Sequence, residues 1–472
     1  MLPWSAFGHI IPFSQLAVSL VRSGLVRVSF LSTPGNLRRI PKLPPDVSPD
    51  LLRFIPLPLA DVKDASGSPL RGEATMDVAF DEIQYLKVAY DLLREPLAGF
   101  LEVSSPDILM VDFASPWAKD LVEERGIPMM MFSIFPASAL AFLMHPDYLT
   151  GERRWETPES LTIPPPWGKF PPSIAYRLHE AIGLHGGIYS KNASDYTDAE
   201  RLGNVLKSSA AITIRSCPEF DRHYLETIEE NIGKPVIPVG FLPRDKSTPP
   251  SSSGSRSPIL EWLDGKTENS VVFVAFGSEL QLTKEHIHEI ALGLELSGIP
   301  FVWALRRPSW ARHIDQNDEE KLAEAILPPG LLERTSSSGK VCFGWVPQFE
   351  IMSHPTIGGT LTHSAWGSVI ETLQFGYPLV LLPFGIDQPL IARDMVHRGL
   401  GVEVERAGDG QYTREGVASA LRFTMVSVDG EKLREKCKEQ SELFGDQELH
   451  QAYVIKFIQR LQSEYCPAPK HD

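Results

Sequence analysis

The sequence predicts an α/β fold of two domains, each with a parallel sheet wrapped by helices. The chain has 472 residues, which is long for one domain. Apolar strand-like runs alternate with amphipathic helical runs in both halves. The polar stretch 244–257 (RDKSTPPSSSGSRS) is typical of a linker. We therefore expect an N-terminal domain over residues 1–243, a linker over 244–257 and a C-terminal domain over 258–472.

The first half supplies the strands of one sheet. Apolar runs predict strands at residues 26–31, 52–57, 107–111, 129–134, 211–215 and 236–239. Pro12 favours the start of a helix over residues 12–23, so Gly8 and His9 are expected in a loop. Only the last residues of a strand precede that loop. We therefore expect either a truncated N-terminus or a start codon assigned too late in the sequence. A helix is expected over 76–103, broken near Pro96.

Two further segments of this half need an interpretation. Residues 127–144 carry no charge over a length that approaches a membrane span. Pro128 and Pro136 interrupt this run, which favours a buried strand followed by a short buried helix. Residues 150–172 are rich in Pro and charge, and predict a long surface loop.

The second half repeats the alternation. Strands are expected at residues 271–276, 301–305, 341–344, 357–362 and 379–382, with a helix at 284–297. Residues 413–462 are amphipathic and predict helix, and the final helix is expected to pack back on the N-terminal domain. No short repeat is present.

Composition excludes some partners. The 45 Lys and Arg against 60 Asp and Glu give a net charge of −15, which disfavours nucleic acid and anionic membrane. The four cysteines show no CxxC pair, so free thiols in a reducing compartment, the cytoplasm, are expected. No signal peptide or integral membrane segment is predicted. We expect a monomer.

Residues 345–388 (WVPQFEIMSHPTIGGTLTHSAWGSVIETLQFGYPLVLLPFGIDQ) concentrate polar and aromatic residues at predicted strand ends. His363 ends one strand, and Ser368 lies near the start of the next helix, where free N–H groups bind phosphate. Open α/β sheets also bind ligands at this edge. Ser368 and Glu371 equally fit a capping box. Glu371 is alternatively suited to accept hydrogen bonds from ribose hydroxyls.

Three more residues follow neighbouring strands. Trp345 offers a flat ring for stacking a base, although a core Trp is the simpler interpretation taken alone. Asp387 and Gln388 suit vicinal hydroxyls, although Asp387 also fits a helix N-cap. Because all these groups follow consecutive strands, a nucleotide-sugar site is predicted.

The 44-residue segment from Trp345 to Gln388 resembles the signature of plant secondary-product UDP-glycosyltransferases, and the likeness extends over nearly the whole chain. The resemblance implies a GT-B fold, with two Rossmann-like domains facing across a cleft. It implies a UDP-sugar co-substrate, with no metal and no other cofactor. The implied donor contacts are Trp345 for uracil; Gln348 and Glu371 for ribose; Ser278, His363 and Ser368 for pyrophosphate; and Trp366, Asp387 and Gln388 for the sugar. Gln at the end of this segment, here Gln388, resembles the family members that use UDP-glucose.

The segment departs from the family at one position. The family usually has His-Cys-Gly-Trp-Asn-Ser, whereas this chain has His-Ser-Ala-Trp-Gly-Ser at residues 363–368. Gly367 therefore lacks the amide that helps to hold phosphate, a loss of about 1 kcal/mol for one hydrogen bond. We expect weaker donor binding or an altered sugar preference.

Sugar transfer needs a base for the acceptor hydroxyl, and His is the natural choice. His9 follows the first strand remnant and Asp112 ends another strand, so both are expected at one edge of the sheet. The resemblance selects His9 as the base and Asp112 as its partner. Direct displacement would then invert an α-linked donor to a β-linked product. Structural roles, a loop His and a capping Asp, are the alternatives.

The acceptor is expected to contact the first half. The candidate walls near strand ends are Trp4, Phe7, Phe113, Trp117, Phe135 and Leu140, each of which also fits an ordinary core position. The motifs at residues 3–9, 30–34 and 303–306 resemble the family branch that extends sugars on terpenoid or flavonoid glycosides, and the loop at 150–172 would cover the acceptor. A glycoside acceptor is therefore expected, and UDP-rhamnose stays open as a donor.

Two other functions are compatible with parts of the sequence. A dinucleotide-dependent oxidoreductase fits two α/β halves, but no GxGxxG follows an early strand. A non-catalytic UDP-sugar binder fits Gly367, although such a protein would not need both His9 and Asp112.

Overall fold

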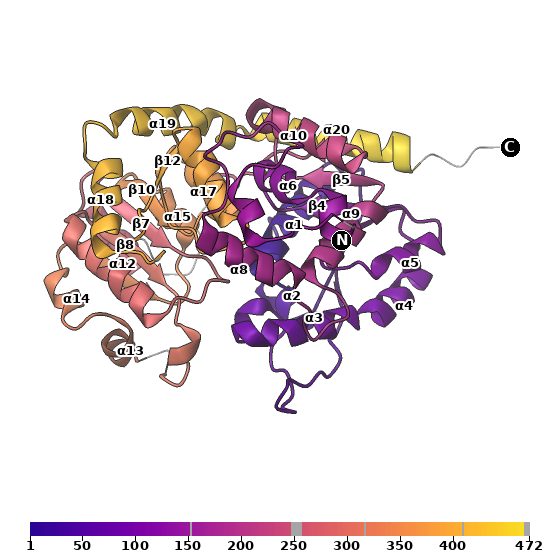
Figure 1. Cartoon of the computed structure of the whole chain (residues 1–472), viewed down its shortest axis with the longest axis horizontal. Helices are drawn as coiled ribbons and strands as arrows, with labels where there is room; N and C mark the ends of the chain where they lie inside the picture. The colour runs from indigo at the N-terminus through magenta and orange to yellow at the C-terminus, as the bar shows by residue number, and fades with distance from the viewer. Residues whose placement is uncertain (152, 247–256, 316–317, 408–409, 467–472) are drawn as a thin grey trace. The chain divides into compact units, whose positions relative to one another are not determined.

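The computed structural model describes residues 1–151, 153–246, 257–315, 318–407 and 410–466. The chain divides into two compact units, each an α/β assembly (Figure 1). The first unit comprises Met1–Pro172, Tyr176–Leu242 and Gln447–Asp472, and the second comprises Ser173–Ala175 and Pro243–Asp446. Most of the predicted linker, residues 247–256, lies outside the described residues. The final helix, α20 (Gln447–Arg460), belongs to the first unit.

The first unit is built on parallel strands. They are β1 (Val28–Ser32), β2 (Leu52–Pro56), β3 (Leu109–Val111), β4 (Met129–Ser133), β5 (Ala211–Ile214) and β6 (Val236–Pro238). β1 pairs with β2, and β3 to β6 pair in chain order. The first residues of the chain join the two groups, because Leu31 N donates to Met1 O and Leu2 N donates to Met110 O, both at 2.9 Å. The order β2, β1, residues 1–2, β3 to β6 is that of a doubly wound sheet.

Helices cover this sheet. They are α1 (Phe7–Val21), α2 (Pro34–Arg39), α3 (Ile83–Asp91), α4 (Arg94–Ser104), α5 (Ala118–Glu123), α6 (Ala137–Leu143), α7 (Pro146–Thr150), α8 (Leu178–Tyr189), α9 (Asp198–Ser208), α10 (Pro218–Ile232) and α20, with short turns at η1 (Thr75–Asp77), η2 (Phe80–Glu82), η3 (Pro158–Thr162) and η5 (Leu461–Tyr465). α1 and α20 share one apolar core, in which Phe13, Phe132 and Phe457 are fully buried.

The prediction for the first helix was wrong at its start. α1 begins at Phe7, five residues before Pro12, and the amides of His9 and Ile10 both donate to Ala6 O at 2.9 Å. The preference of Pro for a first turn misplaced the boundary, since Pro12 lies inside this helix. His9 therefore belongs to the first turn of α1, and its backbone is fixed by helical hydrogen bonds.

Two other predictions in this unit need correction. The predicted helix over 76–103 begins only at Ile83, after the short turns η1 and η2, and it breaks at residues 92–93, between α3 and α4. Pro96 lies in the first turn of α4. A Pro is tolerated there because first-turn N–H groups have no acceptor within the helix. The predicted surface loop at 150–172 contains η3 and two buried apolar side chains, Trp155 and Leu161, so part of it packs on the core.

The second unit contains one sheet of six parallel strands. They are β7 (Val271–Ala275), β8 (Phe301–Leu305), β9 (Gly339–Phe343), β10 (Ile357–Thr362), β11 (Leu379–Leu381) and β12 (Gly401–Glu403). Their order is β12-β11-β10-β7-β8-β9. The chain moves outward from β7 to β9, then returns to β10 on the other side of β7. The carboxyl ends of β7 and β10 therefore form the switch point at which such sheets bind ligands.

Helices cover both faces of this sheet. They are α11 (Pro258–Asp264), α12 (Lys284–Ser297), α13 (Glu319–Ile326), α14 (Leu331–Arg334), α15 (Gln348–Met352), α16 (Trp366–Gln374), α17 (Gln388–His397), α18 (Arg414–Met425) and α19 (Glu431–Gly445), with a turn at η4 (Ser309–Ala311). α12 and α18 lie side by side (Figure 1). A Cβ on Gly293 of α12 would lie 2.6 Å from Val417 Cβ of α18, so glycine permits this close approach. The predicted helical region 413–462 is thus three helices, α18 to α20.

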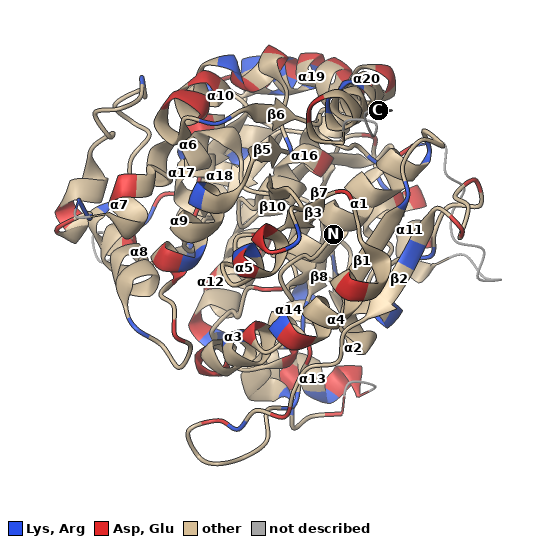
Figure 2. Ribbon diagram, turned by 90° about the vertical axis from the view of Figure 1, so that its right-hand side faces the viewer, with Lys and Arg blue, Asp and Glu red and all other residues tan. Residues whose placement is uncertain are grey.

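The surface shows mixed charge. Along α19, basic and acidic residues are interspersed (Figure 2). All four cysteines are free thiols, with Cys217 and Cys437 buried. A search of the described residues for a helix of membrane-spanning length and hydropathy finds none.

Candidate active site

His9 and Asp112 meet in the first unit. His9 lies in the first turn of α1 and Asp112 directly follows β3, at the switch point of this sheet. His9 Nδ1 and Asp112 Oδ2 are 2.7 Å apart. The Asp112 side chain is 1% exposed and that of His9 is 14% exposed. The structure therefore brings together the two residues that were predicted as a catalytic pair.

The Asp112 carboxylate is fixed by backbone amides. Its Oδ2 accepts from Trp4 N at 3.0 Å, and its Oδ1 accepts from Phe113 N at 2.7 Å. An ionised carboxylate only accepts hydrogen bonds, so His9 Nδ1 carries the proton in the Asp112 contact. His9 Nε2 is then the basic nitrogen. This arrangement is suited to proton abstraction by Nε2.

The six predicted acceptor walls differ in exposure. Phe113 and Phe135 are half-buried and place their rings 5.5 and 6.0 Å from the His9 ring. The other four, Trp4, Phe7, Trp117 and Leu140, are at most 4% exposed. Their burial fits the simpler interpretation of core residues. Only the two phenylalanines thus offer surface beside His9.

The second unit places two predicted phosphate residues at its switch point. His363 follows β10, and Gly277 and Ser278 follow β7. Gly277 has φ +68°, and a Cβ there would lie 2.8 Å from His363 Cε1, so a larger residue would collide with the imidazole. The Ser278 hydroxyl is 3.0 Å from Glu279 Oε1 and donates to it.

The start of α16 lies beside His363. The helix begins at Trp366, with Ala365 as its N-cap and no side-chain cap. The capping-box interpretation of Ser368 and Glu371 is therefore wrong, because Ser368 is already the third helical residue. Amides of the first turn, including those of Gly367 and Ser368, have no acceptor within the helix and suit an anion.

A strained residue adjoins this helix start. Ser364 has φ +68°, a conformation uncommon outside glycine, and it is fully buried. Its Oγ has no hydrogen-bond partner among the described residues. Trp366, predicted to contact the sugar, buries its ring 6.5 Å from that of Phe444, which leaves its backbone as the group suited to a ligand.

Gln348 and Glu371, the predicted ribose residues, are in direct contact. Gln348 begins α15 and its Nε2 donates to Glu371 Oε2 of α16 at 2.6 Å. β9 and β10 are not neighbours, since β8 and β7 separate them. The strand ends are therefore roughly 14 Å apart, at ~4.8 Å per strand. α15 spans part of this distance and makes the site elongated along the sheet edge.

Trp345 is not a core residue. It is 82% exposed, just after β9 and Gly344. Exposure of a large indole is unusual in a free protein and marks a surface that can stack a ligand. The structure excludes the core alternative for this residue.

Replacing Trp345 by Ala is expected to weaken UDP binding without loss of stability. Base stacking on an aromatic ring contributes about 1–3 kcal/mol, or roughly 5- to 150-fold in Kd. Since the side chain is 82% exposed, little packing is lost on truncation. Calorimetric titration with UDP and urea unfolding of the same samples test this. Equal affinity for UDP in both proteins would remove Trp345 from the site.

Asp387 ends the loop before α17, and Gln388 is the first residue of that helix. Gln388 Oε1 accepts from Phe384 N at 2.9 Å, which leaves Nε2 as a donor. Ile386 has φ +56°, so this loop is also strained. Asp387 is the N-cap residue of α17 by position but makes no side-chain cap bond, so the capping interpretation is not supported.

Two side chains that were not predicted from the sequence, Arg406 and Tyr412, support this loop. Arg406 Nη2 donates to Tyr412 Oη at 2.6 Å, and both side chains donate to Pro383 O. The guanidinium also stacks on the Tyr412 ring at 4.4 Å. No local motif pairs Arg406 with Pro383, so only tertiary structure reveals this support.

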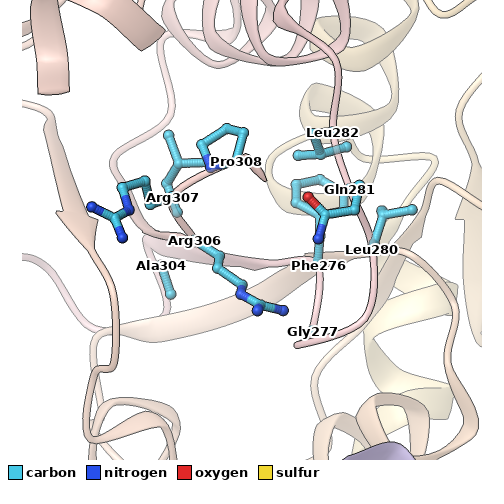
Figure 3. A pocket seen from close by; sticks show the side chains of 10 residues that line it. Phe276, Gly277, Leu280, Gln281, Leu282, Ala304, Arg306, Arg307 and Pro308 are labelled. Carbon is cyan, nitrogen blue, oxygen red and sulfur yellow. The ribbon is translucent and has the colours of Figure 1, made fainter. Parts of the chain in front are cut away.

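A pocket also adjoins Gly277. It is lined by residues 276–277, 280–282 and 304–308 at the ends of β7 and β8, and the Arg306 side chain points toward Gly277 (Figure 3). Gln281 Oε1 accepts from Ser309 N at 3.2 Å and braces its rim. These residues were not among those predicted for the site.

His363 is expected to make stability depend on pH. Burial lowers its pKa from 6.5 to about 4. Between these values the unfolded chain binds more protons than the folded chain, so stability is present above pH ~6.5 and falls as the pH decreases toward ~4. The full loss is about 3 kcal/mol for this residue. Urea unfolding at about pH 7 and about pH 5 measures it.

A matched pair of variants isolates this effect. His363→Asn should lose less stability than the parent between the two pH values, whereas His397→Asn, at an exposed position, should behave as the parent. Burial also lowers the pKa of His286 and His288, which both variants retain. An identical pH dependence in His363→Asn would contradict a neutral buried imidazole.

Comparison with known proteins identifies the family. Residues 252–460 match the family model described as UDP-glucoronosyl and UDP-glucosyl transferase. UDP-glycosyltransferase 91A1 of Arabidopsis thaliana is 38% identical over 98% of this chain and 96% of its own. Soyasaponin III rhamnosyltransferase of Glycine max is 34% identical over 99% and 96%. A solved UDP-glucosyltransferase from Polygonum tinctorium has the same GT-B fold, with TM-score 0.75, 24% identity and 97% of each chain covered. The chain is an enzyme of the plant family 1 UDP-glycosyltransferases.

Proposed function

We propose that this enzyme transfers glucose from UDP-glucose to a sugar hydroxyl of a small plant glycoside, with inversion at the anomeric carbon. The observation that carries the chemistry is the contact of 2.7 Å between His9 Nδ1 and buried Asp112. It leaves Nε2 as a base beside the rings of two half-buried residues, Phe113 and Phe135. A protein that only bound UDP-sugars would not require this pair.

The proposed reaction is a single displacement. His9 Nε2 takes the proton of the acceptor hydroxyl while that oxygen attacks the anomeric carbon. The bond from this carbon to the diphosphate oxygen breaks, and UDP leaves with the electron pair. Asp112 stabilises the imidazolium that forms. An α-linked donor yields a β-linked product.

Donor binding is assigned to the second unit. Trp345 stacks on uracil, and Gln348 with Glu371 binds the ribose hydroxyls. His363, Ser368 and Ser278 hold the pyrophosphate together with the amides at the start of α16, so no metal is required. Gly367 provides its backbone amide but no side chain, which weakens pyrophosphate binding by about 1 kcal/mol.

The sugar itself is assigned to the loop before α17 and to the first residue of that helix. Gln388 Nε2 and the Asp387 carboxylate bind its hydroxyls, with the Trp366 backbone nearby. The strained loop is supported by the Arg406 and Tyr412 contacts to Pro383. UDP-rhamnose is the second candidate donor, because a relative with 34% identity is named a rhamnosyltransferase.

A glycoside acceptor is supported by the names of relatives. These are soyasaponin III rhamnosyltransferase and, at 32% identity over 97% of this chain, Mogroside IIIx synthase of Siraitia grosvenorii. Phe113 and Phe135 present apolar surface that suits the acceptor beside His9. The other four predicted walls are buried, so they are assigned a supporting role and no direct contact with the acceptor.

A substrate screen tests the proposal. The enzyme is incubated with UDP-glucose, UDP-rhamnose or UDP-galactose and with an aglycone or the monoglucoside of that aglycone. The products are identified by mass spectrometry. A gain of one hexose on monoglucosides is expected with UDP-glucose. Product formed only with UDP-rhamnose would replace the donor assignment. Binding of UDP by calorimetry with no product from any pair would indicate a binding protein.

A further inference from the structure

The segment 112–117 is held in place by a buried arginine. It leads from β3 to α5 and begins with Asp112. Arg201 of α9 is 0% exposed, and its Nη1 donates to Ala114 O at 2.8 Å. Ala114 lies two residues after Asp112, so the arginine acts on the backbone that carries the carboxylate.

Asp91, at the end of α3, completes this support. Arg201 Nη1 and Nη2 donate to Asp91 Oδ1 and Oδ2 at 2.7 and 2.6 Å. Asp91 Oδ1 also accepts from Trp117 Nε1 at 3.0 Å. A single ion pair therefore holds the segment at Ala114 and at Trp117.

Tyr90 adds a connection to the other side of Asp112. Its hydroxyl is 3.0 Å from Ser115 Oγ and donates to Pro3 O at 3.0 Å. Pro3 precedes Trp4, whose amide donates to Asp112 Oδ2. Both backbone segments that fix Asp112 are thus tied to consecutive residues at the end of α3.

We propose that Arg201, acting through Asp91, is a positioning residue for the His9–Asp112 pair. The inference rests on the proposed function. Arg201 sets the place of residues 112–117, and this sets the place of the carboxylate that orients His9. Because misplacement of a reacting group by about 1 Å can cost roughly 100-fold in rate, such support bears directly on transfer.

A stabilising role alone does not account for this ion pair. The Arg201 side chain is fully buried and that of Asp91 is 20% exposed, so forming the pair removes most of both charges from water. This removal is costly, and such pairs often stabilise no more than apolar residues do. A second ion pair, Lys87 with Asp198 at 2.6 Å, already connects α3 to α9. Neither of its residues is hydrogen-bonded to residues 112–117 in the described contacts. It provides a matched control.

The test compares two double variants of the full chain. In the first, Arg201→Met with Asp91→Leu replaces the ion pair by apolar side chains. In the second, Lys87→Met with Asp198→Leu removes the control pair. The first is expected to lower kcat about 10- to 100-fold, with KM for UDP-glucose changed less than about twofold. The second is expected to leave both constants near those of the parent.

Proton NMR of the free protein gives a readout that does not depend on the reaction. The hydrogen-bonded Nδ1–H of His9 is assigned by its absence in His9→Gln. It is expected to weaken or vanish in the Arg201 pair variant and to persist in the control. If the parent transfers no sugar at all, the proposed function fails, but this signal still tests positioning.

The results that overturn the inference are distinct. A folded Arg201 pair variant with parental kcat and an unchanged Nδ1–H signal would refute it, as would equal losses in the two double variants. Arg201→Lys covers the case in which the apolar pair does not fold, because it keeps the charge but not the two-pronged contact. A smaller loss of kcat in the same direction is expected there, and parental kcat would count against the proposal.

Discussion

Replacing His9 by Ala is expected to lower kcat for sugar transfer by about 100- to 10,000-fold, the usual contribution of a general base. The variant removes Nε2, the atom proposed to take the acceptor proton. The Kd for UDP-glucose is expected to stay within about twofold of the parent, because the residues proposed to bind the donor belong to the other unit. Steady-state kinetics and calorimetry with UDP-glucose measure the two quantities.

Asp112→Asn is the companion variant. The amide keeps the shape of the carboxylate but offers no negative charge to the imidazolium, and it can hold the wrong tautomer of His9. A loss of kcat smaller than that of His9→Ala, again without loss of donor binding, is expected. Normal turnover in His9→Ala would show that another group removes the proton.

Replacing Glu371 by Ala is expected to raise the Kd for UDP by about 10- to 100-fold. A carboxylate that accepts hydrogen bonds from two ribose hydroxyls gains about 1.5–3 kcal/mol from each of these charge-assisted bonds. Part of this gain is offset, because Glu371 gives up its contact to Gln348 when the ribose binds. Glu371 is half-buried, so the stability of the fold should change little. Titration with UDP, and with uridine for comparison, measures the effect.

Two further variants sharpen this prediction. Glu371→Gln retains the shape and the ability to accept a hydrogen bond, so its affinity should lie between those of the parent and Glu371→Ala. Gln348→Ala removes the hydrogen-bond partner of Glu371 at 2.6 Å, and it should weaken UDP binding less than loss of the Glu371 carboxylate does. If all three variants bound UDP as the parent does, ribose recognition would have to be assigned elsewhere.

The local pattern of the chain was sufficient for most of the parallel strands, but the short edge strand β12 was not predicted. β8, β10 and α12 have the predicted bounds, because their apolar residues are fully buried on both sides or on one clear face. The start of α1 was wrong, since a Pro that is tolerated inside a helix looked like its first residue. The break between α3 and α4 was also misplaced, because no Gly or Pro marks residues 92–93.

The site was predictable where a residue ends a strand. Asp112 directly follows β3 and His9 lies in the first turn of α1, so both lie at the edge of the sheet where its parallel strands end. The alternatives for Trp345 and Ser368 were decided only by exposure and by the first residue of α16. Arg201, Asp91, Arg406 and Tyr412 were not found, since each acts through a partner far away in sequence or through a backbone carbonyl, and neither leaves a local pattern.

The most direct test of the account is the anomeric configuration of the first product. UDP-glucose labelled with ¹³C at the anomeric carbon is mixed with enzyme and the best monoglucoside acceptor, and the new linkage is followed by NMR. A single displacement driven by His9 predicts a β-linked product from the first turnover, formed about 100- to 10,000-fold more slowly by His9→Ala at the same donor occupancy. An α-linked product, or a glucosyl group attached to the protein, would contradict it.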